Sequence, residues 1–169
     1  MYGCVLGAQA SGNHRRSTTR RAAASMIPEL RTIAAPKAMT FTGLLEKIRY
    51  EGAYPTRERA EEALSAVLGG LGAQITGEER AAFAAALPRE AAQEFTRTAP
   101  GGAPVPAAGF VDALAARTGG TAATARWDAG TVLAAVGSLM DPALVARVID
   151  GLPTGYALLF GRAQLTTAA

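Results

Sequence analysis

The stretch "AALPREAAQEF", Ala85 to Phe95, has a counterpart 65 positions later in "DGLPTGYALLF", Asp150 to Phe160. Each copy contains Leu-Pro, six further residues and then Phe. Proline disfavours helical geometry in the residue before it, so each Leu-Pro predicts the end of a helix. We interpret the Leu as the last core anchor of one helix and the Phe as the core anchor of a short helix that follows.

This similarity extends over a longer segment. Residues 67–97 align without gaps to residues 132–162 with nine identities in 31 positions. An Ala-rich chain would give about two or three by chance, so the alignment predicts an internal duplication. The identical positions in the first copy are Val67, Leu68, Gly72, Ala81, Leu87, Pro88, Ala92, Phe95 and Arg97.

Apolar residues at helical spacing predict the other helices of both units. The opening helices carry the stripes Phe41, Leu44, Leu45, Ile48 and Ala107, Phe110, Val111, Leu114. They align at an offset of 66, which implies one extra residue in the first loop of the second unit. The long second helices carry Ala60, Leu64, Val67, Leu68, Leu71, Ile75 and Val132, Leu133, Val136, Leu139, Met140.

Local signals predict where helices begin and where they pack closely. Thr40, Thr56 and Asp141 are expected N-caps, with Pro142 at a first helical position. Thr76-Gly-Glu-Glu79 matches a capping box. Glycines in the long helices cost stability relative to Ala, so we expect another helix to pack closely there. They are Gly69, Gly70, Gly72, Gly130 and Gly137.

The predicted organisation is an all-α protein of two pseudo-repeated four-helix units packed as one helical bundle. A basic, disordered leader occupies residues 1–38, the first unit residues 39–97 and a Pro/Gly linker residues 98–106. The second unit occupies residues 107–162, and residues 163–169 form a C-terminal tail. No run of apolar residues is long enough to cross a membrane, so we expect a soluble, cytoplasmic protein.

The leader concentrates the positive charge. Residues 1–38 hold six Lys or Arg and one Glu, whereas residues 39–169 hold 11 basic and 13 acidic residues. Three interpretations compete: a start site assigned too far upstream of Met39, a disordered basic tail, and a targeting segment. Binding to nucleic acid or an anionic surface is expected only through residues 1–38.

The chain resembles the bacterial domain-of-unknown-function 2267 family over about residues 40–162. The resemblance rests on "FTGLLEKIRYEGAYPTRERAEEALSAVLGGLGAQITGEERAAFAAALP" and on the weaker second copy ending "LPTGYALLF". In the second copy "ALSAVL" becomes "AGTVLA", so that match depends more on hydrophobic spacing than on identical letters. The resemblance implies an all-helical fold of two related halves, and it carries no catalytic residue over to this chain.

Few residues are suited to catalysis. His14 is the only His and Cys4 the only Cys, which excludes triads, an internal disulfide and His- or thiolate-based metal sites in the body. Glu58 and Glu62, spaced i and i+4, form the remaining acid–base or Mg²⁺ candidate. Solvated charge near a helix N-terminus explains them better, so we expect no enzyme activity, no cofactor and no metal.

A helix near the C-terminus offers an interaction surface. Tyr156, Leu158, Leu159 and Phe160 make it apolar on most sides, so it is either buried or a contact for another chain. Trp127 is expected in the core, with an interface anchor as the alternative. The leading hypothesis is a non-catalytic module that binds another protein or associates with itself. The alternatives are binding of nucleic acid or an anionic surface by the leader, and an enzyme using Glu58 and Glu62.

Overall fold

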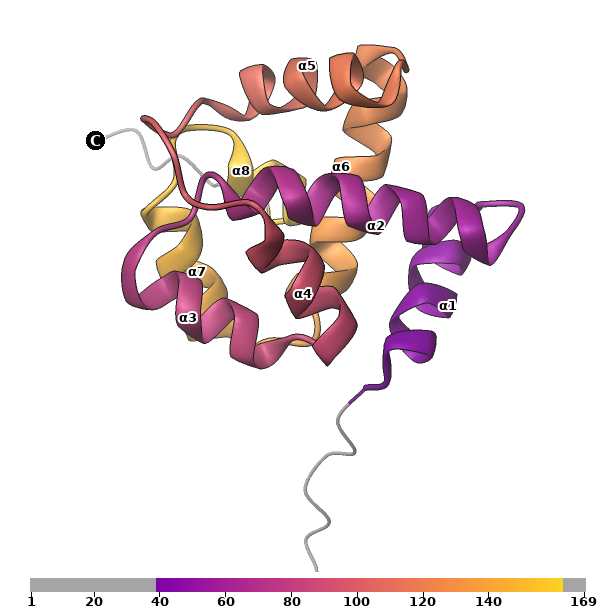
Figure 1. The fold of residues 1–169 in the computed structure, drawn as a ribbon, viewed down its shortest axis with the longest axis horizontal. Helices are drawn as coiled ribbons and strands as arrows, with labels where there is room; N and C mark the ends of the chain where they lie inside the picture. Colours follow the sequence, from indigo (N-terminus) through magenta and orange to yellow (C-terminus); the bar gives the residue numbers. More distant parts are fainter. Residues whose placement is uncertain (1–38, 163–169) are drawn as a thin grey trace, which may run out of the picture. The chain divides into compact units, whose positions relative to one another are not determined.

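A computed structural model describes residues 39–162, which form eight α-helices and no strand (Figure 1). In chain order the helices are α1 (Phe41–Glu51), α2 (Arg57–Gly72), α3 (Gly77–Ala86), α4 (Arg89–Arg97), α5 (Ala107–Thr118), α6 (Ala122–Gly137), α7 (Pro142–Asp150) and α8 (Tyr156–Leu159). The predicted all-α class is therefore confirmed. The segment 98–106, between α4 and α5, contains no helix.

Side-chain caps begin several helices where the sequence predicted them. The Thr40 hydroxyl accepts a hydrogen bond from the Gly43 amide at 3.1 Å, and the Thr56 hydroxyl accepts one from the Arg59 amide at 3.2 Å. Asp141 accepts from the amide of Ala143 at 2.7 Å, ahead of Pro142 at the start of α7. Each cap satisfies a first-turn N–H that has no partner within the helix.

The predicted capping box at Thr76 is wrong. Thr76 precedes α3, but its side chain makes no capping hydrogen bond. The next residue, Gly77, has a φ of 69°, so the chain enters α3 through a left-handed residue and the hydroxyl is not presented to the first-turn amides. A reciprocal capping box occurs instead at the start of α6, where Thr121 and Thr124 bond to each other's backbone amides.

Both Leu-Pro pairs lie at helix ends. Helix α3 ends at Ala86, immediately before Leu87, and α4 begins at Arg89. In the second copy α7 ends at Asp150 and α8 begins at Tyr156. Residues Phe95 and Phe160 are both buried, as the interpretation of these corners required.

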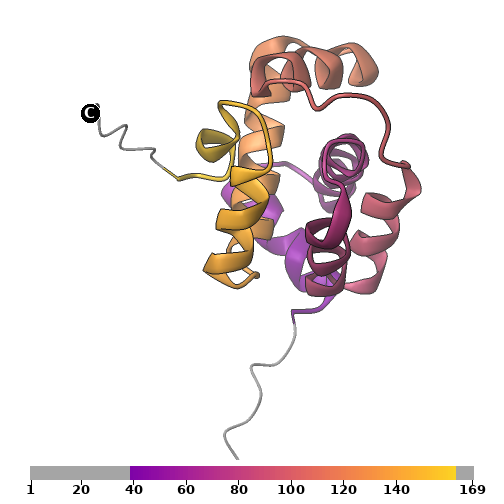
Figure 2. The ribbon, with the colours of Figure 1, turned by 90° about the vertical axis from the view of Figure 1, so that its left-hand side faces the viewer.

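Helices α2 and α6 are central to the packing. Helix α2 contacts α1, α4, α5 and α6, and helix α6 contacts α1, α2, α5 and α8 (Figures 1 and 2). Helix α1 thus packs on α6 while α5 packs on α2, and α3 contacts α7. An internal two-fold axis would produce this reciprocal pairing, and the duplication stays a prediction. One hydrophobic core cluster contains residues from both predicted units.

Close helix packing at glycine occurs at some of the predicted positions. A Cβ added at Gly72 would overlap the Phe95 carbonyl oxygen of α4, and one at Gly137 would lie 3.2 Å from the Phe160 ring. The Gly72–Phe95 and Gly137–Phe160 pairs occupy aligned positions of the predicted duplication. The prediction is wrong for Gly130, where a Cβ would meet no heavy atom within 4 Å.

A polar cluster joins the two predicted units. Asp128, which is 5% exposed, accepts hydrogen bonds from the Tyr54 hydroxyl at 2.6 Å and from Arg59 at 2.7 Å. The Arg59 guanidinium also lies 5.2 Å from the centre of the Tyr54 ring. Burial and the neighbouring Asp128 carboxylate raise the pKa of Tyr54, and the same carboxylate raises the pKa of Arg59. The hydroxyl and the guanidinium therefore hold their protons and satisfy this buried carboxylate.

Candidate interaction surface

Of the four residues predicted to form an interaction surface near the C-terminus, three are buried. Tyr156 is fully buried and Leu159 and Phe160 are each 5% exposed, so these three are core residues. Helix α8 packs against α6. Leu158 alone faces outward, with 61% of its side chain exposed.

The hydroxyl of Tyr156 has no hydrogen-bond partner among the described residues. Burial raises the pKa of Tyr156 to about 12. Its ring lies 5.6 Å from the Phe110 ring, centre to centre. The side chain therefore acts as a core aromatic with an unpaired polar atom.

Leu158 borders a groove formed by the start of α5, the start of α6, and α8. The groove has a volume of about 630 Å³. It is lined by Pro106, Ala107, Ala108, Val111, Asp112, Ala122, Ala123, Arg126, Thr154, Gly155, Leu158 and Leu159. We call it the apolar groove, because eight of these twelve residues are Ala, Val, Leu or Pro.

Small side chains shape the apolar groove. Ala108, Ala122 and Ala123 are exposed along it, so this part of its wall is hydrocarbon, and the exposed Leu158 also lines it. Asp112 and Arg126 contribute one negative and one positive charge. Neither forms an ion pair with another residue within 39–162.

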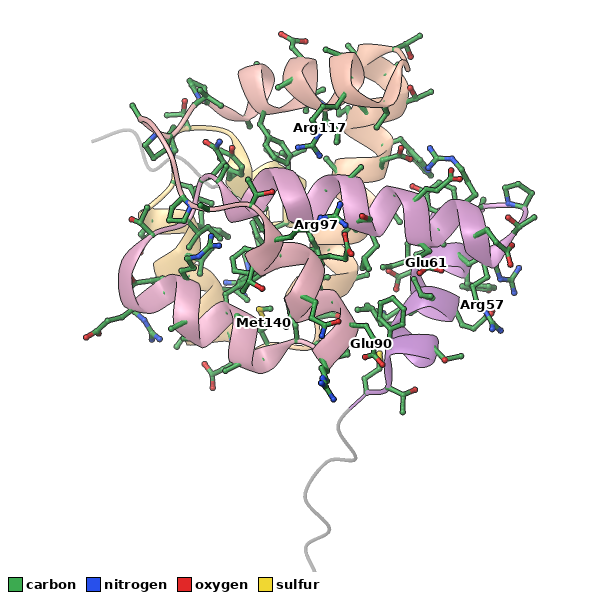
Figure 3. The ribbon with its side chains drawn as sticks, viewed as in Figure 1. Arg57, Glu61, Glu90, Arg97, Arg117 and Met140 are labelled. Carbon is green, nitrogen blue, oxygen red and sulfur yellow. The ribbon has the colours of Figure 1, made fainter. Side chains whose placement is uncertain are left out.

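A second groove, of about 730 Å³, lies among α1, α2 and α4 with a contribution from α5. Five of its lining residues are glutamates: Glu58, Glu61, Glu62, Glu90 and Glu94. Figure 3 shows Glu61 on α2 and Glu90 on α4 beside this groove, with Arg97 at the other end of α4. We call it the acidic groove.

The two grooves are lined by aligned positions of the predicted duplication. Residues 58, 61, 90, 93 and 94 of the acidic groove align at an offset of 65 with residues 123, 126, 155, 158 and 159 of the apolar groove. Gln93 is thus the counterpart of Leu158, and Glu58 the counterpart of Ala123. Sequence reasoning missed both grooves, although comparing the two copies for charge at aligned positions would have shown the contrast.

The candidate pair Glu58 and Glu62 lies in the acidic groove. The pKa of Glu58 is lowered by its own backbone N–H and by the Thr56 hydroxyl, as expected of a carboxylate in a first helical turn. Across residues 39–162, no group of three or more His, Cys, Asp or Glu side chains is arranged to hold a metal ion.

Trp127 is exposed, contrary to the prediction that it belongs to the core. It lies in the second turn of α6 and is 56% exposed. Its indole N–H donates to the Gly52 carbonyl at the end of α1, at 3.0 Å. This hydrogen bond therefore anchors the indole ring to the end of α1, although more than half of Trp127 is exposed.

Two aligned arginines, Arg97 and Arg162, contact residues close to them. Arg97 pairs with Glu94 at 3.2 Å, and Arg162 donates to the Pro142 carbonyl at 3.5 Å. Cys4 and His14, and with them the proposed nucleic-acid contact, lie outside the described residues. No helix in the described part of the chain combines the length and apolar character needed to span a bilayer.

A family model described as "Uncharacterized conserved protein (DUF2267)" matches residues 41–159. No curated protein matches the chain.

Proposed function

The chain belongs to the family of uncharacterised conserved proteins DUF2267, and from that premise we propose that it is a non-catalytic module that binds a protein chain. The bound chain is either a different protein or a second copy. We also propose that the protein is cytoplasmic, as expected from the sequence.

The apolar groove carries this proposal. Leu158, 61% exposed, stands beside a hollow of alanines, and exposed apolar surface of this kind is a common feature of protein contacts. Burying the exposed part of the Leu158 side chain would contribute about 1–2 kcal/mol to such a contact. The acidic groove offers no comparable apolar anchor at the aligned position, where Gln93 replaces Leu158.

Site-specific photo-crosslinking tests the proposal in cells that naturally express the protein. The photoreactive amino acid p-benzoylphenylalanine replaces Leu158 in one variant and Gln93 in a matched control, because both positions are exposed and aligned. We expect a protein adduct from position 158 that exceeds any from position 93. Equal or absent adducts at the two positions would overturn the proposal.

A further inference from the structure

The apolar groove has the features of a self-complementary surface. It combines a projecting side chain, Leu158, with a hollow bordered by Ala108, Ala122 and Ala123. In a two-fold dimer each copy presents the same patch, so a projection and a hollow on one face can each meet their counterpart on the other copy. The Leu158 side chains of both copies would then be buried at the dimer interface.

The charges of the groove also match a second copy. Asp112 and Arg126 are both exposed, carry opposite charges and have no ion-pair partner within the described residues. We propose, resting on the proposed function, that the occupant of the apolar groove is a second copy of this chain. In the resulting two-fold dimer, Arg126 of each copy lies opposite Asp112 of the other.

The acidic groove is unsuited to the same association. Its lining holds five glutamates against two arginines, Arg97 and Arg117, and so carries a net negative charge. Among the described residues, Glu94 is the one of these glutamates that forms an ion pair, with Arg97. Two copies meeting at this face would juxtapose like charges, which opposes association. Only one of the two aligned grooves therefore supports pairing, and because a two-fold contact is closed, assembly stops at the dimer.

Sedimentation velocity of the purified full-length chain, over a concentration series, tests this inference. We expect a dimer whose dissociation constant rises at least about tenfold in Leu158→Glu. Gln93→Glu is the matched control, because it places the same new charge at the aligned exposed position of the acidic groove; it should leave the dimer unchanged. Circular dichroism of each variant confirms that the fold is kept.

Charge reversal distinguishes this interface from other dimer contacts. Asp112→Arg should weaken the dimer, because the new Arg at position 112 of each copy would face Arg126 of the other copy. The double variant Asp112→Arg with Arg126→Asp exchanges the charges and should recover most of the wild-type dissociation constant. Failure of the double variant to recover would overturn the proposed pairing.

Sedimentation tests the dimer and photo-crosslinking tests the binding function, so the two proposals can fail separately. A wild-type chain that stays monomeric up to about 200 µM overturns the dimer, as does a dimer that is insensitive to Leu158→Glu. If the photoreactive residue at position 158 still forms adducts with a different protein, the chain remains a binding module with another partner. If no adduct forms either, both proposals are lost.

Discussion

Two glycines in the long central helices should respond oppositely to the same substitution. Gly72 ends α2 and Gly130 lies within α6. On helix propensity alone, Gly→Ala stabilises a helix interior by about 0.5–1 kcal/mol. We expect this gain for Gly130→Ala, because the new methyl group would meet no heavy atom within 4 Å.

At Gly72 the new methyl group would overlap the Phe95 carbonyl oxygen and lie 3.2 Å from its carbon. Both atoms belong to the backbone of α4, so the helix itself must move away by about 1 Å, which forfeits a quarter to a half of the affected dispersion contacts. Helix α4 buries Ala91 and Phe95 completely, and overpacking of this kind costs about 1–3 kcal/mol. After subtraction of the propensity gain, we expect Gly72→Ala to lower the free energy of unfolding by about 1 kcal/mol.

Urea denaturation followed by circular dichroism at 222 nm measures the free energy of unfolding of both variants. The curves are fitted with one common slope of unfolding free energy against urea concentration. The aligned variant Gly137→Ala provides an intermediate, because the Phe160 ring 3.2 Å away can shift more easily than a backbone. The expected order of stability is Gly130→Ala, Gly137→Ala, then Gly72→Ala. A Gly72→Ala protein as stable as Gly130→Ala would refute the close approach of α2 and α4.

Three other side chains give separate tests. Tyr156→Phe removes a buried hydroxyl without a described partner, so it should raise the free energy of unfolding by about 1 kcal/mol, seen as a higher urea midpoint. The pKa of Tyr156 is raised from 10.0 to about 12 in the folded state, so above pH 10 the unfolded chain loses this proton before the folded chain does. Tyr156 therefore adds no pH dependence below pH 10 and lowers the free energy of unfolding as the pH rises from 10 to 12, and the Phe variant should lose less stability over that range. Arg59→Met leaves the Asp128 carboxylate buried without its ion pair, and should destabilise by about 2 kcal/mol, below the range for fully buried pairs because Arg59 is 37% exposed; replacing Asp128 by Leu as well should recover part of that loss. Trp127→Phe removes the hydrogen bond to the Gly52 carbonyl and should cost about 1 kcal/mol in thermal denaturation, whereas a core tryptophan would cost several times more.

The sequence by itself determined that the described chain is helical, and where most of its helices begin. Helical periodicity, the caps at Thr40, Thr56 and Asp141, and the two Leu-Pro pairs act through residues close in the chain, so no knowledge of distant segments is needed to interpret them. One prediction that failed is the capping box at Thr76, where the left-handed Gly77 altered the local geometry that the motif requires. The other is the extent of the long helices: α2 ends at Gly72 and α6 at Gly137, so Ile75, Leu139 and Met140 lie beyond the helices to which their spacing assigned them.

Only the tertiary structure decided which faces are covered. Tyr156 and Trp127 look alike in sequence as large aromatics near helix starts, yet α6 contributes to covering one while the other stays exposed. Likewise Gly72 meets another backbone and Gly130 does not. Burial depends on what a distant segment places against a side chain, and that is a property of the packing of all eight described helices. For the same reason the apolar groove, which joins α5, α6 and α8, could be found only once the packing was known.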